Sequence, residues 1–309
     1  MQISDVMTHS VITAPPGMSL ALAQRLMDDH RIRHLPVVQE GQLIGLVSDR
    51  DIRQALPSPM TTLTQAERTY KLWTLAIATC MTRAVVTVPP DAAIVQGLRQ
   101  LLAGPYGCVP VLARGQLVGI VTAVDLLRGV LMDLGSVAAR RPVRAHMQYA
   151  PLTAHPEELV SQAHHRMHSA DVRHLPIVAA DGTLLGLLSD RDLRQAGAST
   201  LPPLSRYEAP LQLMTMQVKD IMRTDVTTVG DETTLADAGQ LLLEHKIGCL
   251  PVLHHDRTLV GMVTMTDLLR AYVAVQRTGA LVQLAYFGLV LALLAAALLA
   301  ALGGLLLLD

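Results

Sequence analysis

The chain has 309 residues, a nearly balanced charge of 25 basic against 26 acidic residues, and three cysteines. The length predicts about two domains, and the near-neutral charge argues against a nucleic-acid partner bound through phosphate neutralisation. The cysteines have no CxxC spacing, so we interpret Cys80, Cys108 and Cys249 as small core or cleft-lining residues in a reducing compartment.

The first 56 residues carry the local signals of a small β-α-β-β-α unit. Ser19 is the predicted N-cap of the first helix, with Leu22, Leu26 and Ala23 on its buried face. Glu40 and Gly41 are the predicted turn of a hairpin between two apolar strands. The expected strand, helix, strand, strand and helix cover residues 11–13, 19–29, 36–38, 43–47 and 48–55. A unit of this size is too small to bury its sheet alone, so we expect it to pair with a neighbour.

The same unit occurs four times along the chain. Each copy has a Leu-Pro-Val-like triplet followed by a run of the form Gly-apolar-apolar-Ser/Thr-x-x-Asp. The triplets are residues 35–37, 109–111, 175–177 and 250–252, and the runs are residues 45–51, 119–125, 186–192 and 261–267. Copies one and three, and copies two and four, are separated by 140 to 142 residues. This spacing indicates a two-unit module that was duplicated as a whole.

On these motifs the chain resembles the cystathionine β-synthase (CBS) domain family, and each pair of units resembles a Bateman module. The resemblance extends over nearly all of residues 1–275. The connectors at 67–81 and 206–222 also resemble those of bacterial stand-alone CBS proteins similar to acetoin-utilisation regulators. The implied fold is α/β (α+β), with four β-α-β-β-α CBS units in two Bateman modules that pack into an intramolecular disc, plus one C-terminal hydrophobic helix.

The repeat also sets the expected boundaries. Module 1 covers residues 1–132, with units at 1–56 and 75–132. A linker at 133–143 leads to module 2 at 144–275, with units at 144–197 and 216–275.

Residues 279–308 contain no charged side chain. A membrane span needs about 20 apolar residues, so we predict a single transmembrane helix there. Arg270 and Arg277 precede it, which predicts an inner (cytoplasmic) membrane location with the CBS modules in the cytoplasm. A hydrophobic helix buried inside a soluble oligomer is the alternative. A stripe of small residues at every fourth position leaves self-association into a homodimer open.

Each Ser/Thr-x-x-Asp run has two interpretations that the residues alone leave open. It is close to a helix capping box, and the same groups at a helix N-terminus would bind phosphate and ribose hydroxyls. The resemblance implies the second role. In CBS modules this Asp holds the ribose, the Ser/Thr lies near ribose and phosphate, and a first-strand Thr lies beside the nucleotide. The expected nucleotide-binding residues are Thr13, Ser48 and Asp51; Thr87, Thr122 and Asp125; Thr153, Ser189 and Asp192; and Thr228, Thr264 and Asp267.

Arginines distinguish the two kinds of unit. Near the Asp, units one and three carry Arg50 with Arg53 and Arg191 with Arg194, whereas units two and four keep only Arg128 or Arg270. Because a guanidinium binds phosphate bidentately, we expect the first kind to prefer ADP or ATP. The second kind would prefer AMP or another less charged adenosyl group, or stay empty. S-adenosylmethionine or a cyclic dinucleotide is an alternative ligand, and a solvated helix face is the alternative for the arginines.

Other groups are weaker candidates. His164 and His168 have metal-ligand spacing on a predicted helix, but no zincin motif accompanies them, and a polar helix face explains them as well. Tyr70 and Trp73, in the connector between units, are expected to pack in the core at the module seam, and base stacking is the alternative. No nucleophile elbow, Walker loop or GxGxxG occurs, and the repeats leave no segment for a catalytic domain. We therefore predict no enzyme activity, no catalytic residue, no metal site and no tightly bound cofactor.

The sequence thus predicts a membrane-tethered regulatory sensor. It would bind adenosine nucleotides in the clefts between CBS units and signal by conformational change to a partner, expected to be a membrane protein. The alternative is a ligand-free structural module for assembling a membrane complex. A Mg²⁺-responsive regulator is a third interpretation, with only ordinary acidic pairs to support it.

Overall fold

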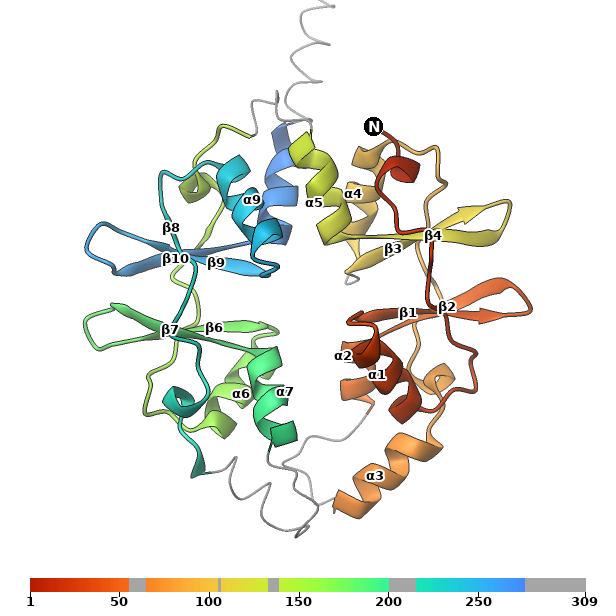
Figure 1. Ribbon diagram of the computed structural model, residues 1–309, viewed down its shortest axis with the longest axis horizontal. Helices are drawn as coiled ribbons and strands as arrows, with labels where there is room; N and C mark the ends of the chain where they lie inside the picture. Colours follow the sequence, from red (N-terminus) through yellow and green to blue (C-terminus); the bar gives the residue numbers. More distant parts are fainter. Residues whose placement is uncertain (56–64, 105–106, 133–138, 200–214, 276–309) are drawn as a thin grey trace, which may run out of the picture.

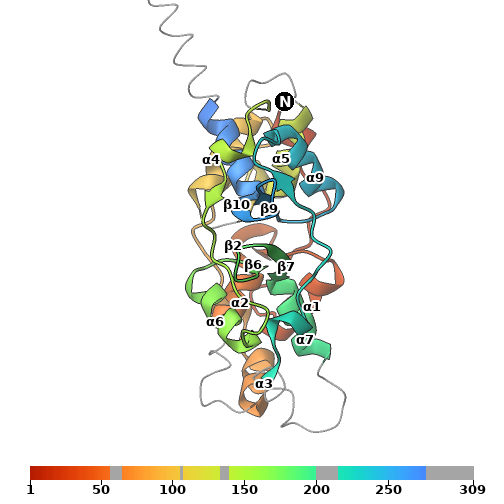
Figure 2. The same ribbon diagram turned by 90° about the vertical axis from the view of Figure 1, so that its left-hand side faces the viewer.

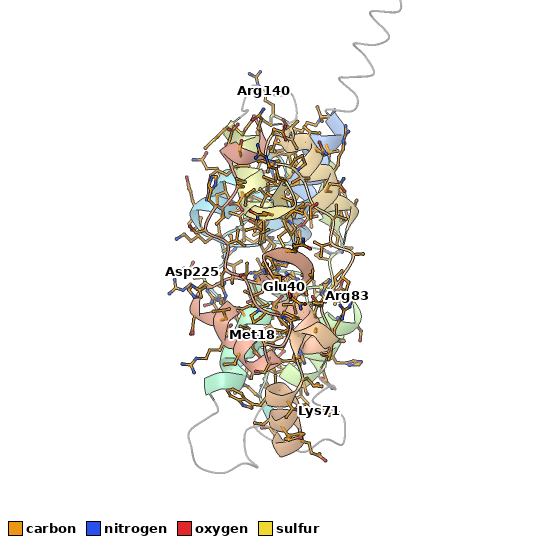
Figure 3. The ribbon with its side chains drawn as sticks, turned by 90° about the vertical axis from the view of Figure 1, so that its right-hand side faces the viewer. Met18, Glu40, Lys71, Arg83, Arg140 and Asp225 are labelled. Atoms are coloured by element: carbon orange, nitrogen blue, oxygen red, sulfur yellow. The ribbon has the colours of Figure 1, made fainter. Side chains whose placement is uncertain are left out.

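The computed structural model of the protein describes residues 1–55, 65–104, 107–132, 139–199 and 215–275. These residues form four α/β units in a flattened disc (Figures 1 and 2). Units 1 and 2 lie on one side of the disc, and units 3 and 4 lie on the other (Figure 1). Lys71 and Arg140 lie near opposite ends of the disc (Figure 3).

Module 1 contains two copies of one element order. Unit 1 consists of α1 (Leu20–Asp29), β1 (His34–Gln39), β2 (Gln42–Ser48) and α2 (Asp49–Gln54). Unit 2 consists of α4 (Ile94–Ala103), β3 (Cys108–Ala113), β4 (Gln116–Thr122) and α5 (Ala123–Met132). Helix α3 (Gln65–Thr74) lies between the two units in the chain.

Module 2 repeats this order. Unit 3 consists of α6 (Val160–Ser169), β6 (His174–Val178), β7 (Leu184–Ser189) and α7 (Asp190–Ser199). Unit 4 consists of β8 (Val229–Gly230), α9 (Leu235–Glu244), β9 (Cys249–Leu253), β10 (Leu259–Thr264) and a helix at 265–275, and β5 (Gln148–Tyr149) adds to its sheet. Short 3₁₀ turns precede the units at Ile3–Asp5, Ile77–Thr79, Val143–Ala145 and Val218–Asp220.

Local sequence rules account for the hairpins and helix starts. The Ser19 hydroxyl accepts a hydrogen bond from the Leu22 N–H at 3.3 Å and caps α1, as predicted. Glu40 and Gly41 have φ of +52° and +79°, the left-handed pair that a tight two-residue hairpin turn requires. The buried face of α1 agrees with the prediction at Ala23, which is buried together with Leu20 and Met27, and differs from it at Leu22, which is 46% exposed.

The strand predicted at 11–13 is wrong in extent. Only the next residue, Ala14, pairs with β1, in parallel with Val37. The Ala14 N–H donates to the Pro36 carbonyl, and the Val38 N–H donates to the Ala14 carbonyl. The chain continues with Pro15, which has no N–H to extend the ladder.

Each unit is completed by the segment that precedes its sister unit. The Ile3 N–H donates to the Ala92 carbonyl of unit 2 at 2.9 Å, and the Ile3 side chain is fully buried there. A Cβ at Gly97 would lie only 2.5 Å from Ile3 Cδ1, so the Ile3 side chain would have to shift if a larger residue replaced this glycine. Conversely, Thr82 pairs with Leu46 of unit 1. The two units of a module are therefore interlocked by exchanged segments rather than simply placed side by side.

The two seams between the modules differ in chemistry. Units 2 and 4 share one continuous hydrophobic core, in which α5 packs against α9 (Figure 1). Units 1 and 3 have separate hydrophobic cores. They are joined by the ion pairs of Arg50 with Asp171 and of Arg53 with Asp190. We call these the apolar seam and the polar seam.

Two expectations need correction. The predicted transmembrane helix at 279–308 lies outside the described residues, and no helix within those residues is long and apolar enough to cross a bilayer. A helix such as α9, with 10 residues, spans about 15 Å of a ~30 Å hydrocarbon core. The predicted inner-membrane location is therefore wrong on this finding. Tyr70 and Trp73 are 69% and 57% exposed on α3, so they do not pack in the core at the seam.

Candidate functional site

Each predicted corner, where a strand ends and a helix begins, is a capping box. The Ser48 hydroxyl and the Ser48 N–H both donate to Asp51 Oδ2 at 2.7 Å, and the Asp51 N–H donates to Ser48 Oγ at 3.3 Å. The same three bonds recur in the pairs Thr122–Asp125, Ser189–Asp192 and Thr264–Asp267. The structural interpretation of the repeated run is thus present in every unit.

The capping bonds use one carboxylate oxygen, Oδ2, and leave Oδ1 for another partner. Oδ1 of Asp125 lies 3.8 Å from Arg128 Nη1, and Oδ1 of Asp267 lies 3.8 Å from Arg270 Nη1, too far for a hydrogen bond. Within the described residues, Oδ1 of Asp51 has no hydrogen-bond partner. A carboxylate oxygen in this position can accept a bond from a ligand hydroxyl.

The glycine that begins each run leaves room for the segment exchanged from the sister unit, whose methionine side chain lies against it. A Cβ at Gly45 would lie 2.6 Å from Met81 Sδ, and a Cβ at Gly119 would lie 2.5 Å from Met7 Sδ. Gly186 and Gly261 have the same relation to Met222 and Met147, at 2.9 Å and 2.6 Å. Each corner is therefore built from two parts, the strand and helix of one unit and the methionine-containing segment exchanged from its sister.

The first-strand threonines occupy four equivalent places. Each directly precedes the residue that pairs in parallel with the Leu-Pro-Val strand. Thr13 is exposed, and Thr87, Thr153 and Thr228 are half-buried. Among the described residues, no hydrogen bond joins any of them to the Asp of its corner, so each threonine and its corner stand on adjoining elements without a direct bond.

Two of the predicted phosphate-binding arginines have partners across the polar seam. Arg50 donates to Oδ1 of Asp171, and Arg53 donates to Oδ2 of Asp190. Arg53 also donates from Nε to the Asp49 carbonyl at 3.2 Å. These guanidinium groups therefore join module 1 to module 2 in the structure rather than pairing with Asp51.

The remaining predicted groups show no further site. Arg191 is exposed, and the side chain of Arg194 lies outside the described residues. His164 and His168 are exposed on α6, and the described part of the chain has no cluster of side chains able to hold a metal ion.

Sequence reasoning missed Arg223. Its Nε donates to Asp192 Oδ1 at 2.8 Å, so both oxygens of this carboxylate are bonded. Burial alone would raise the pKa of Asp192, but the hydrogen bonds from Ser189 and Arg223 outweigh it and hold that pKa below its usual value. An alignment of the four copies on the methionine that precedes the first strand would have shown that only one copy has a charged residue directly after this methionine. The next residue is Thr8, Thr82, Gln148 or Arg223.

Two histidines were also missed. A Cβ at Gly107 would lie 2.8 Å from His34 Cε1, and one at Gly248 would lie 3.0 Å from His174 Cε1, so each imidazole packs on a glycine of its sister unit. Burial lowers the pKa of both histidines to about 4. They are therefore neutral at pH 7 and fill space at the first positions of β1 and β6.

Two hollows in the described structure lie away from the corner carboxylates. One is on α6 and is lined by Glu158, Ser161, Gln162, His165 and Arg166. The other is apolar and lies where α5, α9 and the helix at 265–275 meet. Neither hollow is lined by the aspartate of a corner.

Proteins of known structure share this fold. Protein MJ1225 of Methanocaldococcus jannaschii is 22% identical over 270 residues, which are 85% of this chain and 95% of that protein. Its crystal structure matches with a TM-score of 0.74 and 20% identity, covering 88% of this chain and all of that one. This likeness shows a common fold.

Shorter matches cover about one module. A CBS domain-containing protein of Dictyostelium discoideum is 35% identical over 103 residues, 33% of this chain and 71% of that protein. The crystal structure of CBSX2 of Arabidopsis thaliana in complex with AMP matches 44% of this chain and 98% of that one, with 28% identity and a TM-score of 0.39.

The CBS domain family matches residues 3–58, 77–131, 143–199 and 218–274. These ranges include every corner, both seams and all three sheets of the described structure, and they leave no separate catalytic domain in the described residues. With four copies that together occupy well over half of its length, the chain belongs to the CBS domain family.

Proposed function

We propose that this protein is a regulatory sensor that binds adenosine nucleotides at its CBS corners and signals by a change in how its modules pack. The observation that carries the proposal is the repeated corner. A hydroxyl and a carboxylate at a helix start are fixed by three bonds, and the carboxylate keeps Oδ1 for another donor in units 1, 2 and 4. Such a carboxylate can accept bonds from the vicinal hydroxyls of ribose.

The capping bonds would position the binding group before the ligand arrives. Because Oδ2 of Asp51 is held by Ser48, the direction of Oδ1 is fixed, and little side-chain entropy is lost on binding. The adjoining first strand, with Thr13, would form the side wall for the purine. Equivalent groups in the other units would act in the same way, which makes adenosyl compounds the ligand class we propose.

The signal would arise at the polar seam. Arg50 and Arg53 now bind the carboxylates of Asp171 and Asp190, and a nucleotide phosphate at unit 1 would compete for the same guanidinium groups. Loss of these pairs would loosen the polar seam, whereas the apolar seam, a continuous core, would hold the modules together. A ligand changes this equilibrium only by binding one arrangement better than the other, and competition for two arginines provides that difference.

Thermal unfolding with AMP, ADP or ATP tests the binding step. Ligand at 100 times its dissociation constant should stabilise the protein by about 2.7 kcal/mol. Asp51→Ala should reduce the shift by removing one corner, and Asp225→Ala, an exposed aspartate labelled in Figure 3, is the matched control. An Asp51→Ala protein with unchanged nucleotide affinity at that corner would refute the assignment of the ribose-binding group.

Solution scattering and hydrogen exchange test the signalling step. We expect saturating nucleotide to increase exchange near the polar seam and to leave the apolar seam protected. Identical profiles with and without nucleotide would leave no conformational change to pass to a partner protein.

One observation favours the alternative of a ligand-free assembly module. In every corner the hydroxyl and the Oδ2 of the Asp are already bonded within the capping box, and the seam arginines already have carboxylate partners. If no adenine nucleotide at millimolar concentration changes the unfolding temperature, this structural role is the better description.

A further inference from the structure

One position varies among four otherwise equivalent corners. It lies directly after the methionine of the exchanged segment, and its N–H pairs with the strand that leads into the corner. The Thr82 N–H donates to the Leu46 carbonyl at 2.9 Å, and the Arg223 N–H donates to the Leu187 carbonyl at 3.0 Å. The same place is filled by Thr8 beside Ile120 and by Gln148 beside Met262. Three corners therefore have a neutral side chain here, and only unit 3 has a cation.

The cation closes the corner of unit 3. Nε of Arg223 donates to Asp192 Oδ1 at 2.8 Å, and the Ser189 hydroxyl donates to Oδ2. Asp192 is 6% exposed and is the one buried charged side chain among the described residues. The Arg223 side chain is 57% exposed, so it covers the carboxylate from the solvent side. Among the residues at these four positions, only Arg223 bonds to the Asp of its corner within the described structure.

In two of the other corners the aspartate side chain is more exposed than Asp192. The carboxylates of Asp125 and Asp267 are 13% and 19% exposed. The side chains of their neighbours Arg128 and Arg270 are 55% and 64% exposed, and each lies 3.8 Å from Oδ1 of its Asp. At this distance there is no hydrogen bond that a ribose hydroxyl would have to displace. The four corners therefore have the same backbone arrangement, but they differ in whether Oδ1 of the Asp is available to a ligand.

We infer that Arg223 is a built-in competitor for the ligand at unit 3, and that this residue makes unit 3 the weakest of the four corners for an adenosyl ligand. The inference rests on the proposed function. A hydroxyl that binds Asp192 Oδ1 must replace a charge-assisted hydrogen bond, which is about twice as strong as a neutral one. The difference corresponds to about tenfold weaker binding at this corner.

The competitor has a second consequence for ligand choice. An adenosyl compound that displaces Arg223 leaves a mobile guanidinium at the mouth of the corner, because the side chain is largely exposed on its outer side. Adenosine offers that cation no anionic partner. The penalty at unit 3 is therefore clearest with this neutral nucleoside, which makes adenosine the sharpest probe.

A reciprocal exchange on the full chain tests the inference. Arg223→Thr gives unit 3 the residue of unit 1, and Thr82→Arg gives unit 1 the residue of unit 3. Calorimetric titration with adenosine should show about tenfold tighter binding at one corner in R223T and about tenfold weaker binding at one corner in T82R. Adding Asp192→Asn to R223T should abolish the gain, because the gain acts through that carboxylate. Lys219→Thr removes the same charge from the same segment and should change nothing.

The outcomes separate this inference from the proposed function. If wild type binds adenosine and R223T binds it with the same affinity and stoichiometry, the competitor role is overturned and the sensor stands. If R223T binds AMP more weakly than wild type, Arg223 is a phosphate ligand, which also overturns the role. If neither protein binds adenosine or AMP, the proposed function fails and the inference with it. Arg223→Gln, which gives unit 3 the residue found in unit 4, is the control for folding. Its far-ultraviolet circular dichroism and its thermal unfolding should be the same as those of wild type.

Discussion

The polar seam should contribute a measurable and salt-sensitive coupling between the modules. Arg53 is 36% exposed and Asp190 21% exposed, so their ion pair lies between a surface pair and a buried one. Exposed pairs contribute about 0.2–1 kcal/mol, and hydrogen bonds to charged groups contribute about 1.5–3 kcal/mol when shielded from water. With about a third of the Arg53 side chain exposed to solvent, we expect a coupling free energy of about 1 kcal/mol.

A double-mutant cycle measures this coupling. The free energy of unfolding in urea is determined for wild type, Arg53→Ala, Asp190→Ala and the double variant, and the non-additive part is the coupling. It should fall as the ionic strength is raised from about 0.05 M to about 0.5 M, because the Debye length shortens. The pair Arg25–Asp29, 3.8 Å apart with side chains 76% and 64% exposed, is the control and should couple by no more than a few tenths of a kcal/mol. A coupling for Arg53 and Asp190 no larger than this control, or one that salt leaves unchanged, would refute the account of the seam.

Three further outcomes follow from burial. Burial lowers the pKa of His34 and His174 from 6.5 to about 4, so the unfolded state takes up protons first. Stability should be complete above pH 6.5 and decrease toward pH 4, by at most about 1.4 kcal/mol per pH unit for each histidine. Thermal unfolding against pH should show this slope, and His34→Asn should flatten it. Burial raises the pKa of Cys108 and Cys249 to about 12, so neither thiol should react with a disulfide reagent at pH 8 until the protein unfolds. Ile3→Ala should reduce the free energy of unfolding by about 2–5 kcal/mol and loosen unit 2 rather than unit 1 in hydrogen exchange.

Short-range rules explain what could be predicted from the sequence. The hairpin turn at Glu40 and Gly41, the cap at Ser19 and the capping box at Ser48 depend on residues within a few positions of each other. Their geometry therefore appears in local patterns. The fourfold repeat then extends one correct local interpretation to the whole chain, and the family match confirms the four CBS units.

What was missed depends on contacts that no local pattern contains. Arg53 and its partner Asp190 are 137 positions apart, and Arg223 lies 31 positions from Asp192. The sequence placed Arg53 near a phosphate because it follows Asp51 on the same helix, but the direction of its side chain depends on how the modules face each other. Arg223 could have been found, since it is the one charged residue at a position that is otherwise threonine or glutamine.

The two seams together explain how one disc can be both cohesive and responsive. At the apolar seam Gly239 of α9 allows Leu131 of α5 to approach within 3.1 Å of the position of a Cβ, and Leu127 and Tyr272 are buried nearby. Separating such a surface exposes apolar area at about 25 cal/mol per Å². At the polar seam, water and phosphate can replace each carboxylate partner of the arginines, so separation there has a much smaller free-energy cost. A ligand of modest affinity can therefore shift the polar seam without breaking the disc, provided that its anionic groups reach Arg50 or Arg53. The free energy available for signalling is then limited by the roughly 1–2 kcal/mol that those two pairs contribute together.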